Sequence, residues 1–337
     1  MSYTAMGTTG ETAIVSREPD RSGNFVCDGT ADNVQIQRAI DHVIELGGGT
    51  VKLLRGEYFL DDVVVVDAPV WIKGSGMTWQ GDEAGTSIVS TGALAGENMF
   101  EFFNAGDRFH FAGMSDLDLL NFDGNNSILI QGLADASFRR IYFNEGIQNG
   151  IYILGTSFDM WNIWIQDCLF ENMTIAGIKV DSADHDIIKC HILDNYFYAC
   201  DIGVVLQEDA AAGGYMSWFN IRGNQIWDIL KTGIQLWKEC DHISIVDNLL
   251  SNIGTFDVGV YNGIRVGDGG DPASECEWIS IIGNIIDGGT NAKYGISLEG
   301  TTDYVTVLGN QIHRCVTAPY NAEVGVTNVE HAHNIEV

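Results

Sequence analysis

Hydrophobic and polar residues alternate along short segments that each begin with a glycine. Six of these segments follow one another from residue 150 onward: Gly150-Ile-Tyr-Ile, Gly177-Ile-Lys-Val, Gly203-Val-Val-Leu, Gly233-Ile-Gln-Leu, Gly263-Ile-Arg-Val and Gly295-Ile-Ser-Leu. Their glycines lie 26 to 32 residues apart. Alternation with a period of two is typical of a β-strand with one buried face and does not fit a helical repeat. The pattern therefore predicts one strand per repeat.

A second series of segments ends in asparagine and is interleaved with the first. Its members are Ile192-Leu-Asp-Asn195, Ile221-Arg-Gly-Asn224, Ile245-Val-Asp-Asn248, Ile281-Ile-Gly-Asn284 and Val307-Leu-Gly-Asn310. Two series with a similar mean period indicate that one structural unit is repeated. We expect an all-β fold, a right-handed single-stranded parallel β-helix of about nine coils with three short strands in each. At ~4.8 Å per coil, the body would be roughly 40 Å long.

The repeated asparagines have a structural explanation. A buried turn leaves backbone N–H and C=O groups without water, and a stacked asparagine amide can bond both those groups and the asparagine of the next coil. We therefore do not expect these asparagines to be catalytic. The same corner can be traced backwards through Cys168, Ile141, Met114 and Ser75.

The N-terminal part follows a different pattern. Residues 1–24 are expected to be a lead-in segment, and residues 25–337 a single β-helix domain that starts with a capping helix at about 32–46. Asp32 and Gln35 fit a capping box, and the apolar face of the helix would be formed by Ile36, Ile40, Val43 and Ile44. Such a helix would cover the open end of the solenoid core.

The N-terminal part of the chain resembles a known family. The segments Asp28-Gly-Thr-Ala-Asp32-Asn-Val-Gln-Ile-Gln37-Arg-Ala-Ile40, Gly47-Gly-Gly-Thr-Val51 and Gly56-Glu-Tyr-Phe-Leu60 resemble the opening of the pectate-lyase-like β-helix superfamily. Phage tailspike depolymerases and many glycanases share that opening. The resemblance implies the fold far more than a function, because lyases, hydrolases, epimerases and binders all occur in the superfamily. The motif set of polygalacturonases and the Asp-Pro-His motif of alginate epimerases are absent, with only a faint echo in Ala183-Asp-His-Asp186.

Composition narrows the choice of partners. Among 337 residues, 46 are acidic and 17 basic, which gives a formal charge of −29. Nucleic acid is an unsuitable partner because phosphate binding needs clustered Lys and Arg. No uninterrupted apolar stretch is long enough for a transmembrane helix, so no membrane partner is expected. The excess of acids is explained by the solubility of an extended solenoid or by a salty habitat.

Cysteine usage and the start of the chain add two further expectations. The seven cysteines include no CxxC pair, and Cys168 and Cys190 are expected to face inward as small core residues. Residues 1–10 are polar and contain no signal for general secretion. The location of the protein is left unknown by the sequence, with a virion or the extracellular space both open.

Outward positions on the glycine-led strands form the candidate site. Alternation places two columns of side chains there, and a mixture of aromatic rings, amides and charges suits an extended sugar chain. The expected substrate-binding residues are Tyr152, Gln207, Gln235, Trp237, Asp268 and Glu299. The expected catalytic residues are Lys179, Asp181, Glu208 and Arg265. An ordinary solvated sheet face would show a similar mixture, so this alternative stays open.

Two mechanisms are compatible with these residues. Hydrolysis needs two carboxyl groups ~5–9.5 Å apart, and Asp181 with Glu208 is the best pair, followed by Asp268 with Glu299. Elimination from a uronate instead needs a cation to neutralise the sugar carboxylate and a base to take its C5 proton, and Lys179 or Arg265 could supply the cation.

A calcium site is a further hypothesis. No cofactor is required by either mechanism, but Asp181, Asp184 and Asp186 could supply oxygen ligands to Ca²⁺. A solvated acidic turn is the simpler explanation of these three residues. Among the histidines, His191 is expected on the outward surface of the second strand, away from the candidate site, and His242 in a turn at its edge.

The sequence leaves three functions open. The first is a polysaccharide-active enzyme, either a lyase or a glycoside hydrolase, that works on the glycine-led face. The second is a phage-like receptor-binding spike that grips glycans with little or no cleavage. The third is a purely structural solenoid. The final residues, His333 to Val337, resemble the opening of another coil, and a homotrimer would cover such an edge.

Overall fold

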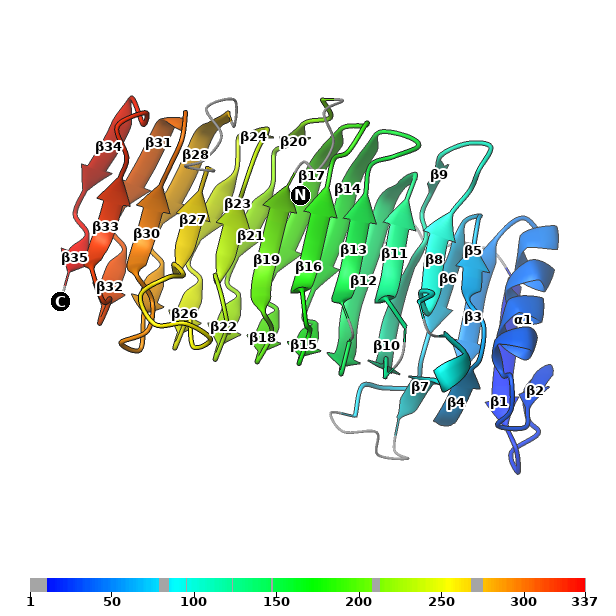
Figure 1. The fold of residues 1–337 in the computed structure, drawn as a ribbon. Coiled ribbons are helices and arrows are strands. Elements are labelled where there is room, and N and C mark those ends of the chain that lie inside the picture. The colour runs from blue at the N-terminus through cyan, green and yellow to red at the C-terminus, as the bar shows by residue number, and fades with distance from the viewer. Residues whose placement is uncertain are drawn as a thin grey trace.

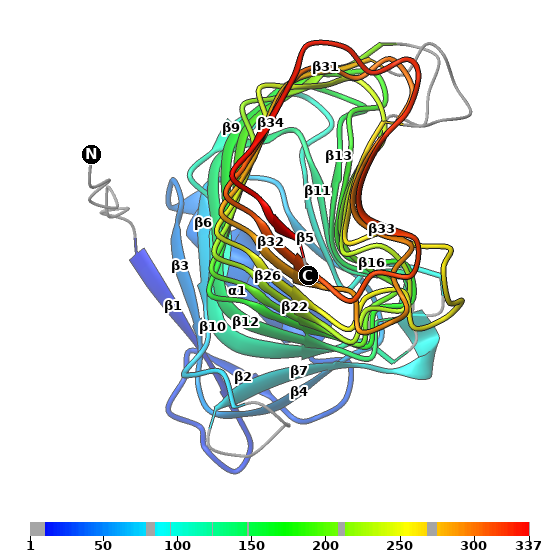
Figure 2. The ribbon, with the colours of Figure 1, turned by 90° about the vertical axis from the view of Figure 1, so that its left-hand side faces the viewer.

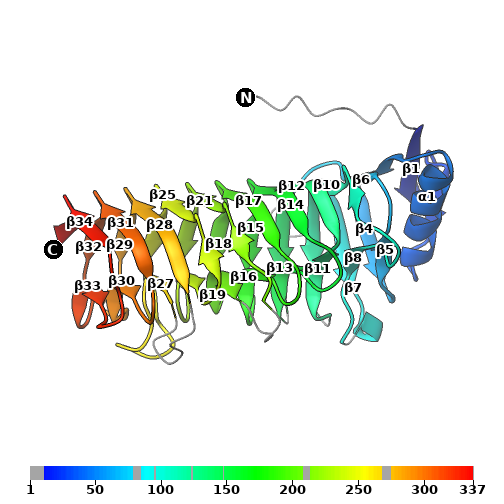
Figure 3. The ribbon, with the colours of Figure 1, turned by 90° about the horizontal axis from the view of Figure 1, so that it is seen from above.

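The computed structural model describes residues 11–78, 85–94, 96–122, 124–146, 148–207, 213–267 and 275–336. They form a right-handed parallel β-helix of about nine coils, as the repeats predicted (Figure 1). The strands belong to a ten-stranded and a 25-stranded sheet, both built from parallel pairs in which each strand pairs with the strand one coil later. Seen from above, the coils stack in one direction from the N-terminal helix to the C-terminal strands (Figure 3).

The ten-stranded sheet contains the six glycine-led strands and four further strands. It consists of β5 (Val64–Val66), β8 (Phe100–Phe103), β11 (Asn126–Gln131), β13 (Asn149–Leu154), β16 (Ala176–Asp181), β19 (Ile202–Gln207), β23 (Ile234–Leu236), β27 (Ile264–Val266), β30 (Tyr294–Leu298) and β33 (Ala318–Ala322). The glycine-led strands are those from β13 to β30. A 3₁₀ helix, η1 (Gly92–Leu94), precedes β8.

The 25-stranded sheet bends at the asparagine corner, so that each coil adds two further strands. The second strands of the coils are β3 (Gly49–Leu53), β6 (Val70–Lys73), β9 (Phe109–His110), β14 (Met160–Gln166), β17 (Ile187–Leu193), β20 (Met216–Ser217), β21 (Asn220–Arg222), β24 (Cys240–Asp241), β25 (Ser244–Val246), β28 (Cys276–Ile282), β31 (Asp303–Leu308) and β34 (Val329–Ala332). The third strands are β2 (Phe25–Cys27), β4 (Gly56–Leu60), β7 (Thr86–Ser90), β15 (Leu169–Glu171), β18 (Tyr196–Tyr198), β22 (Gln225–Trp227), β26 (Leu249–Ser251), β29 (Ile285–Asp287), β32 (Gln311–His313) and β35 (Ile335–Glu336). Three longer strands run through both positions: β1 (Glu11–Arg17), β10 (Gly113–Leu120) and β12 (Leu133–Asn144).

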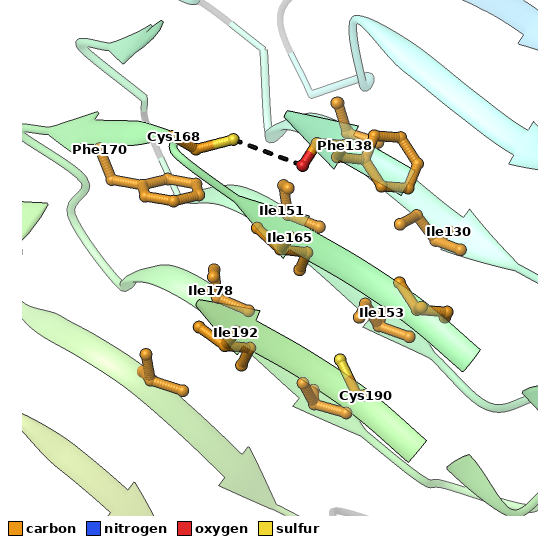
Figure 4. Close-up of a cluster of buried hydrophobic side chains, with 14 of the residues drawn as sticks. Ile130, Phe138, Ile151, Ile153, Ile165, Cys168, Phe170, Ile178, Cys190 and Ile192 are labelled. Carbon is orange, nitrogen blue, oxygen red and sulfur yellow. Dashed lines mark hydrogen bonds between the residues drawn. The ribbon is translucent and has the colours of Figure 1, made fainter. Parts of the chain in front are cut away.

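The core is a continuous apolar column along the solenoid axis. Isoleucines from the ten-stranded sheet and from the second strands meet inside it, as Ile151 and Ile165 do in Figure 4. Cys168 and Cys190 are buried there as expected, and the Cys168 thiol donates to the carbonyl oxygen of Phe138 at 3.6 Å (Figure 4). Burial raises the pKa of the Cys168 thiol to about 12, so this cysteine is a neutral core residue.

The leading glycines are required because their side-chain positions are already filled. A Cβ atom at Gly177 would lie 2.4 Å from Cδ1 of Phe197, and one at Gly150 would lie 2.5 Å from Cδ1 of Phe170. These two phenylalanine rings stack on each other inside the core with centroids 4.9 Å apart. The repeated glycine therefore makes room for a core side chain of the third strand.

The asparagine corner forms the ladder that the sequence predicted. The Nδ2 group of each member donates to the Oδ1 atom of the next, at 2.9 to 3.1 Å, from Asn195 to Asn334. Cys168 occupies the same corner one coil earlier, since its N–H donates to Asn195 Oδ1 at 3.0 Å. A shorter second ladder, which the repeats did not reveal, links Asn98, Asn126 and Asn149.

The capping helix is also confirmed, although not its expected cap. Helix α1 (Asn33–Glu45) covers the N-terminal end of the core and buries Ile36, Ile40 and Val43 (Figure 1). The capping box is wrong, because Asp32 makes no side-chain hydrogen bond to the helix. Its carboxylate accepts the N–H groups of Gly29 at 3.0 Å and Phe59 at 2.9 Å instead. Strand β1, within the segment expected as a lead-in, pairs with β2 and β3.

Candidate functional site

The outward columns of the ten-stranded sheet have the expected register. Strand pairing places these residues in one row: Glu101, Leu129, Tyr152, Lys179, Val205, Gln235, Arg265 and Ser297. The neighbouring row contains Leu154, Asp181 and Gln207. In the end-on view of Figure 2 this sheet forms the inward-curving side of the coil. The alternation of the sequence thus correctly predicted which residues share this register, although Val205, Gln235 and Ser297 are buried.

Three side chains from β13 and β16 form the Tyr152 cluster. The Tyr152 hydroxyl donates to Asp181 Oδ2 at 3.1 Å, and Lys179 Nζ lies 3.7 Å from the same oxygen. The Lys179 ammonium also lies 4.8 Å from the centroid of the Tyr152 ring. The other oxygen of Asp181 accepts the N–H of Ala183 at 3.1 Å. The carboxylate is only 2% exposed, so its partners fix its position.

A second group, the Arg265 cluster, lies toward the C-terminal end of the same face. The Nε and Nη2 groups of Arg265 both donate to Glu299 Oε2, at 2.9 and 2.7 Å. Ser297 Oγ donates to the other oxygen of Glu299 at 2.9 Å. The guanidinium lies 5.7 Å from the centroid of the Trp237 ring. An aromatic ring and an ion pair are therefore presented side by side.

Two expectations for this face need correction. Gln235 has the predicted register, but the residue is only 4% exposed, so it offers a ligand little surface. Arg265 lies three coils from Lys179, roughly 14 Å at ~4.8 Å per coil, and cannot act on the same sugar ring. Gln207 is half-buried and pairs with Asp181, so it occupies the next position in the same row.

The expected carboxylate pairs cannot be compared with the distances that hydrolysis needs. Glu208 and Asp268 both lie outside the described residues. Asp181 and Glu299 are four coils apart, roughly 19 Å at ~4.8 Å per coil. This is beyond the ~5–9.5 Å separation that hydrolysis requires.

The three aspartates considered for calcium are not brought together as ligands. Across the described ranges, no group of three His, Cys, Asp or Glu side chains could hold a metal ion. Asp181 is engaged with Tyr152 and Lys179, whereas Asp186 Oδ1 accepts the N–H of Tyr215 at 2.9 Å. Asp184 is exposed. These residues therefore do not fit a calcium ion, and no catalytic step is assigned to one.

The outward surface of the second strands, which we call the second-strand face, carries features that the sequence analysis missed. His191 lies on it as expected, but its ring stacks on that of Trp164 with centroids 4.0 Å apart. Pockets of about 600 and 350 Å³ open on this face. The sequence offered only a weak signal, the recurrence of tryptophan in and beside the second strands at Trp161, Trp164, Trp218 and Trp278.

Comparisons with known proteins agree with the architecture. A family model described as a right-handed β-helix region matches residues 115–250. No curated protein sequence matches the chain. Pairing, coil geometry and the matched model together identify the chain as a right-handed parallel β-helix protein.

Similar solved structures share the fold at low identity. The A-module of the Azotobacter vinelandii mannuronan C-5 epimerase AlgE6 is 17% identical, with a TM-score of 0.58 over 93% of this chain and 97% of that module. An alginate lyase from Paenibacillus is 11% identical, with a TM-score of 0.58 over 96% and 99%. The tailspike protein of the E. coli bacteriophage HK620, solved with a pentasaccharide, is 16% identical, with a TM-score of 0.61 over 94% of this chain and 64% of the tailspike. The chain thus spans just under two thirds of that tailspike.

In the described part of the chain, no helix combines the length and the apolar character needed to span a bilayer.

Proposed function

We propose that this protein binds an extended, uronate-containing polysaccharide along the outward face of the ten-stranded sheet and cleaves it by elimination at the Tyr152 cluster. The observation that carries the proposal is the contact between Tyr152, Lys179 and Asp181 on successive coils. A cation, a hydroxyl and a buried carboxylate in contact are the groups that elimination from a uronate needs.

Each side chain has a distinct role in this reaction. The Lys179 ammonium lies beside the sugar carboxylate and reduces its charge, which makes the C5 proton more acidic. Tyr152 removes that proton while its own phenolic proton passes along the existing hydrogen bond to Asp181 Oδ2. The electron pair of the C5–H bond forms the C4–C5 double bond, the C4–O4 bond breaks, and water protonates the departing oxygen. The hydroxide that this leaves takes up the proton held by Asp181, which restores the carboxylate and water.

The Arg265 cluster would bind a more distant part of the chain. Arg265 can approach a uronate carboxylate, and Trp237 presents a flat ring to a sugar face. The distance of roughly 14 Å from Lys179 places this contact several sugar units from the reacting ring. Support for a glycan ligand also comes from the names of the similar structures, since mannuronan and alginate are uronate polymers.

Glycan binding without cleavage is the second candidate function. The carboxylates of Asp181 and Glu299 are 2% and 12% exposed and are held by cationic partners, which favours a preformed binding surface. The pentasaccharide-bound tailspike is consistent with this alternative. The expected homotrimer stays a prediction, which light scattering of the purified protein would test.

Product analysis separates the candidates. The protein is incubated with alginate, polymannuronate, polygalacturonate, hyaluronan, xylan and dextran, and both new reducing ends and the ultraviolet absorbance of a conjugated double bond are followed. Elimination raises both signals together, whereas hydrolysis raises only the first. Tyr152→Phe should lower the rate by about 10²-fold or more, because it removes the group that transfers the proton. Reducing ends without absorbance, or full activity of Tyr152→Phe, would contradict the proposed reaction.

A further inference from the structure

The second-strand face has a regular backbone feature. One non-glycine residue in each of seven consecutive coils adopts a left-handed conformation at the same register position, with φ between 51° and 61°: Asp135, Asn162, Lys189, Trp218, His242, Trp278 and Tyr304. Such a conformation costs roughly 1–2 kcal/mol for a residue with a Cβ atom. Because it is repeated, the second strand of each of these coils bends at the same position, and the bends form one line along the solenoid.

The larger pocket lies along this line in the middle of the solenoid. It has a volume of about 600 Å³, and its lining includes Trp161, Asn162 and Trp164 from β14 together with Lys189 and His191 from β17. The Trp164 and His191 rings are stacked, so they form one rigid aromatic wall. The other indole, Trp161, packs against the guanidinium of Arg108. A flat apolar wall beside polar groups is the arrangement that binds the faces and hydroxyls of a pyranose ring.

The polar groups of this pocket are already oriented by one another. Asn162 Nδ2 donates to Asp135 Oδ1 at 2.7 Å, and Trp164 Nε1 donates to Asn162 Oδ1 at 3.1 Å. The other oxygen of Asp135 lies 2.9 Å from Nδ1 of His110. Asp135 also lines the pocket, so a preorganised carboxylate and amide are available to ligand hydroxyls.

Two buried nitrogen atoms at the pocket lack a hydrogen-bond partner. Among the described residues these are Nε of Arg108, which packs on Trp161, and Nδ1 of His191, which lines the pocket. The Arg108 guanidinium lies 3.6 Å from the centroid of the Trp161 ring, and this contact holds the guanidinium beside a ring that lines the pocket. Burial, followed by the charge of Lys189, lowers the pKa of His191, so its imidazole is neutral. A neutral ring nitrogen without a partner suits a sugar hydroxyl, and buried polar groups are rarely left unsatisfied without a reason.

The aromatic line continues beyond this pocket. Trp218 stacks on His242 with centroids 4.2 Å apart, and Trp278 stacks on Tyr304 at 4.3 Å. Trp218 and Trp278 are 55% and 50% exposed. The smaller pocket, of about 350 Å³, is lined by the Trp218 and His242 rings together with polar side chains that include Asn220 and Arg222. Charged and amide side chains therefore occur in both pockets of this face, unlike the centre of a protein–protein interface, where charges are depleted.

From these observations we propose that the second-strand face is a separate saccharide-binding site that holds a pyranose unit in the pocket between Trp161, Trp164 and His191. Its ligand class rests on the proposed function, but its residues are independent of the Tyr152 cluster. The two faces lie on opposite sides of the coil (Figure 2). A long glycan held on the second-strand face would therefore keep the protein attached to the polymer while another segment occupies the ten-stranded sheet.

Affinity electrophoresis tests this site, since the acidic protein migrates readily in a native gel. Gels contain alginate, polymannuronate, polygalacturonate, hyaluronan, xylan or dextran, and retardation is measured for the intact chain. The test variants are Trp164→Ala and Asp135→Asn, and Trp227→Ala is the matched control because Trp227 is 39% exposed on the third strands. Asp135→Asn preserves shape and tolerates the left-handed backbone, so it remains informative if the tryptophan variant folds poorly.

The expected result is an apparent dissociation constant about tenfold higher in both test variants and unchanged in Trp227→Ala. Cleavage of short oligosaccharides should be retained by the test variants, which separates this site from the Tyr152 cluster. Equal retardation of the wild type and both test variants would overturn the second site while leaving the proposed function intact. Absence of retardation of the wild type by every polysaccharide, together with absence of cleavage, would overturn both.

Discussion

The asparagine ladder offers the sharpest test of the fold, and Asn248→Ala is the change that examines it. Asn248 is 1% exposed, and its side chain takes part in four hydrogen bonds. Its Nδ2 group donates to the carbonyl of Ile221 and to Asn284 Oδ1, at 2.9 and 3.0 Å. Its Oδ1 atom accepts the backbone N–H and the Nδ2 group of Asn224, at 3.0 and 2.9 Å.

Alanine would remove all four bonds and leave buried groups without partners. The backbone N–H of Asn224 would lose its acceptor inside a dry turn, at a cost of about 1–3 kcal/mol. The remaining bonds contribute about 1 kcal/mol each, and some of that loss is recovered by rearrangement of the neighbouring amides. We therefore expect the free energy of unfolding to fall by about 3–5 kcal/mol.

Urea unfolding followed by far-ultraviolet circular dichroism measures this change. The control is Gln225→Ala, which removes an exposed amide at the start of β22, directly after Asn224. We expect the control to change the free energy by no more than about 0.5 kcal/mol. If Asn248→Ala were no more destabilising than Gln225→Ala, the ladder would not be a source of stability and this account of the corner would be refuted.

Three further predictions follow from the same structure. Gly177→Ala should destabilise the fold by about 1–3 kcal/mol, because its Cβ atom would meet Phe197, whereas Gly106→Ala has room; urea unfolding of both variants measures the difference. The Arg314 guanidinium donates a hydrogen bond to the Asp287 carboxylate and lowers its pKa. The ionised form of Asp287 therefore stabilises the fold at pH values above the unfolded pKa of about 4. The difference in stability between wild type and Asp287→Asn should therefore be present at neutral pH and disappear as the pH falls below about 4; no pH dependence would contradict the ion pair. Initial rates on a polyuronate should rise when the ionic strength is raised from about 0.01 to 0.1 M, because added salt screens the repulsion between the substrate and the protein charge of −29. Rates that only fall over this range would argue against a polyanionic substrate.

Much of the fold was predictable because it repeats. Alternation of apolar residues specified which residues of the ten-stranded sheet share a row, and strand pairing confirms the register of that row from Tyr152 through Lys179 to Arg265. The asparagines were equally informative, since a polar amide at one position of every coil has one natural partner, the amide of the next coil. Local pattern and global fold agree at these positions.

Features that depend on contacts between different coils were not predictable. Asp32 fits a capping box, yet it bonds the N–H of Phe59, 27 residues later in the chain. The bend of the second strands was equally hidden, because Trp218, Trp278 and Tyr304 adopt a left-handed conformation that is uncommon for bulky residues. Without that bend, the tryptophans of the second strands appear in the sequence only as scattered surface residues.

The most direct test of the proposed function is the rate at which Lys179→Met produces the conjugated double bond from a polyuronate that the wild type cleaves. Lys52→Met is the matched control, since Lys52 is an exposed lysine on β3, outside the ten-stranded sheet. Loss of the Lys179 charge should lower the rate by about 10²-fold or more, because the sugar carboxylate is then no longer neutralised, while Lys52→Met keeps the wild-type rate. Equal rates for the two variants would contradict elimination at the Tyr152 cluster.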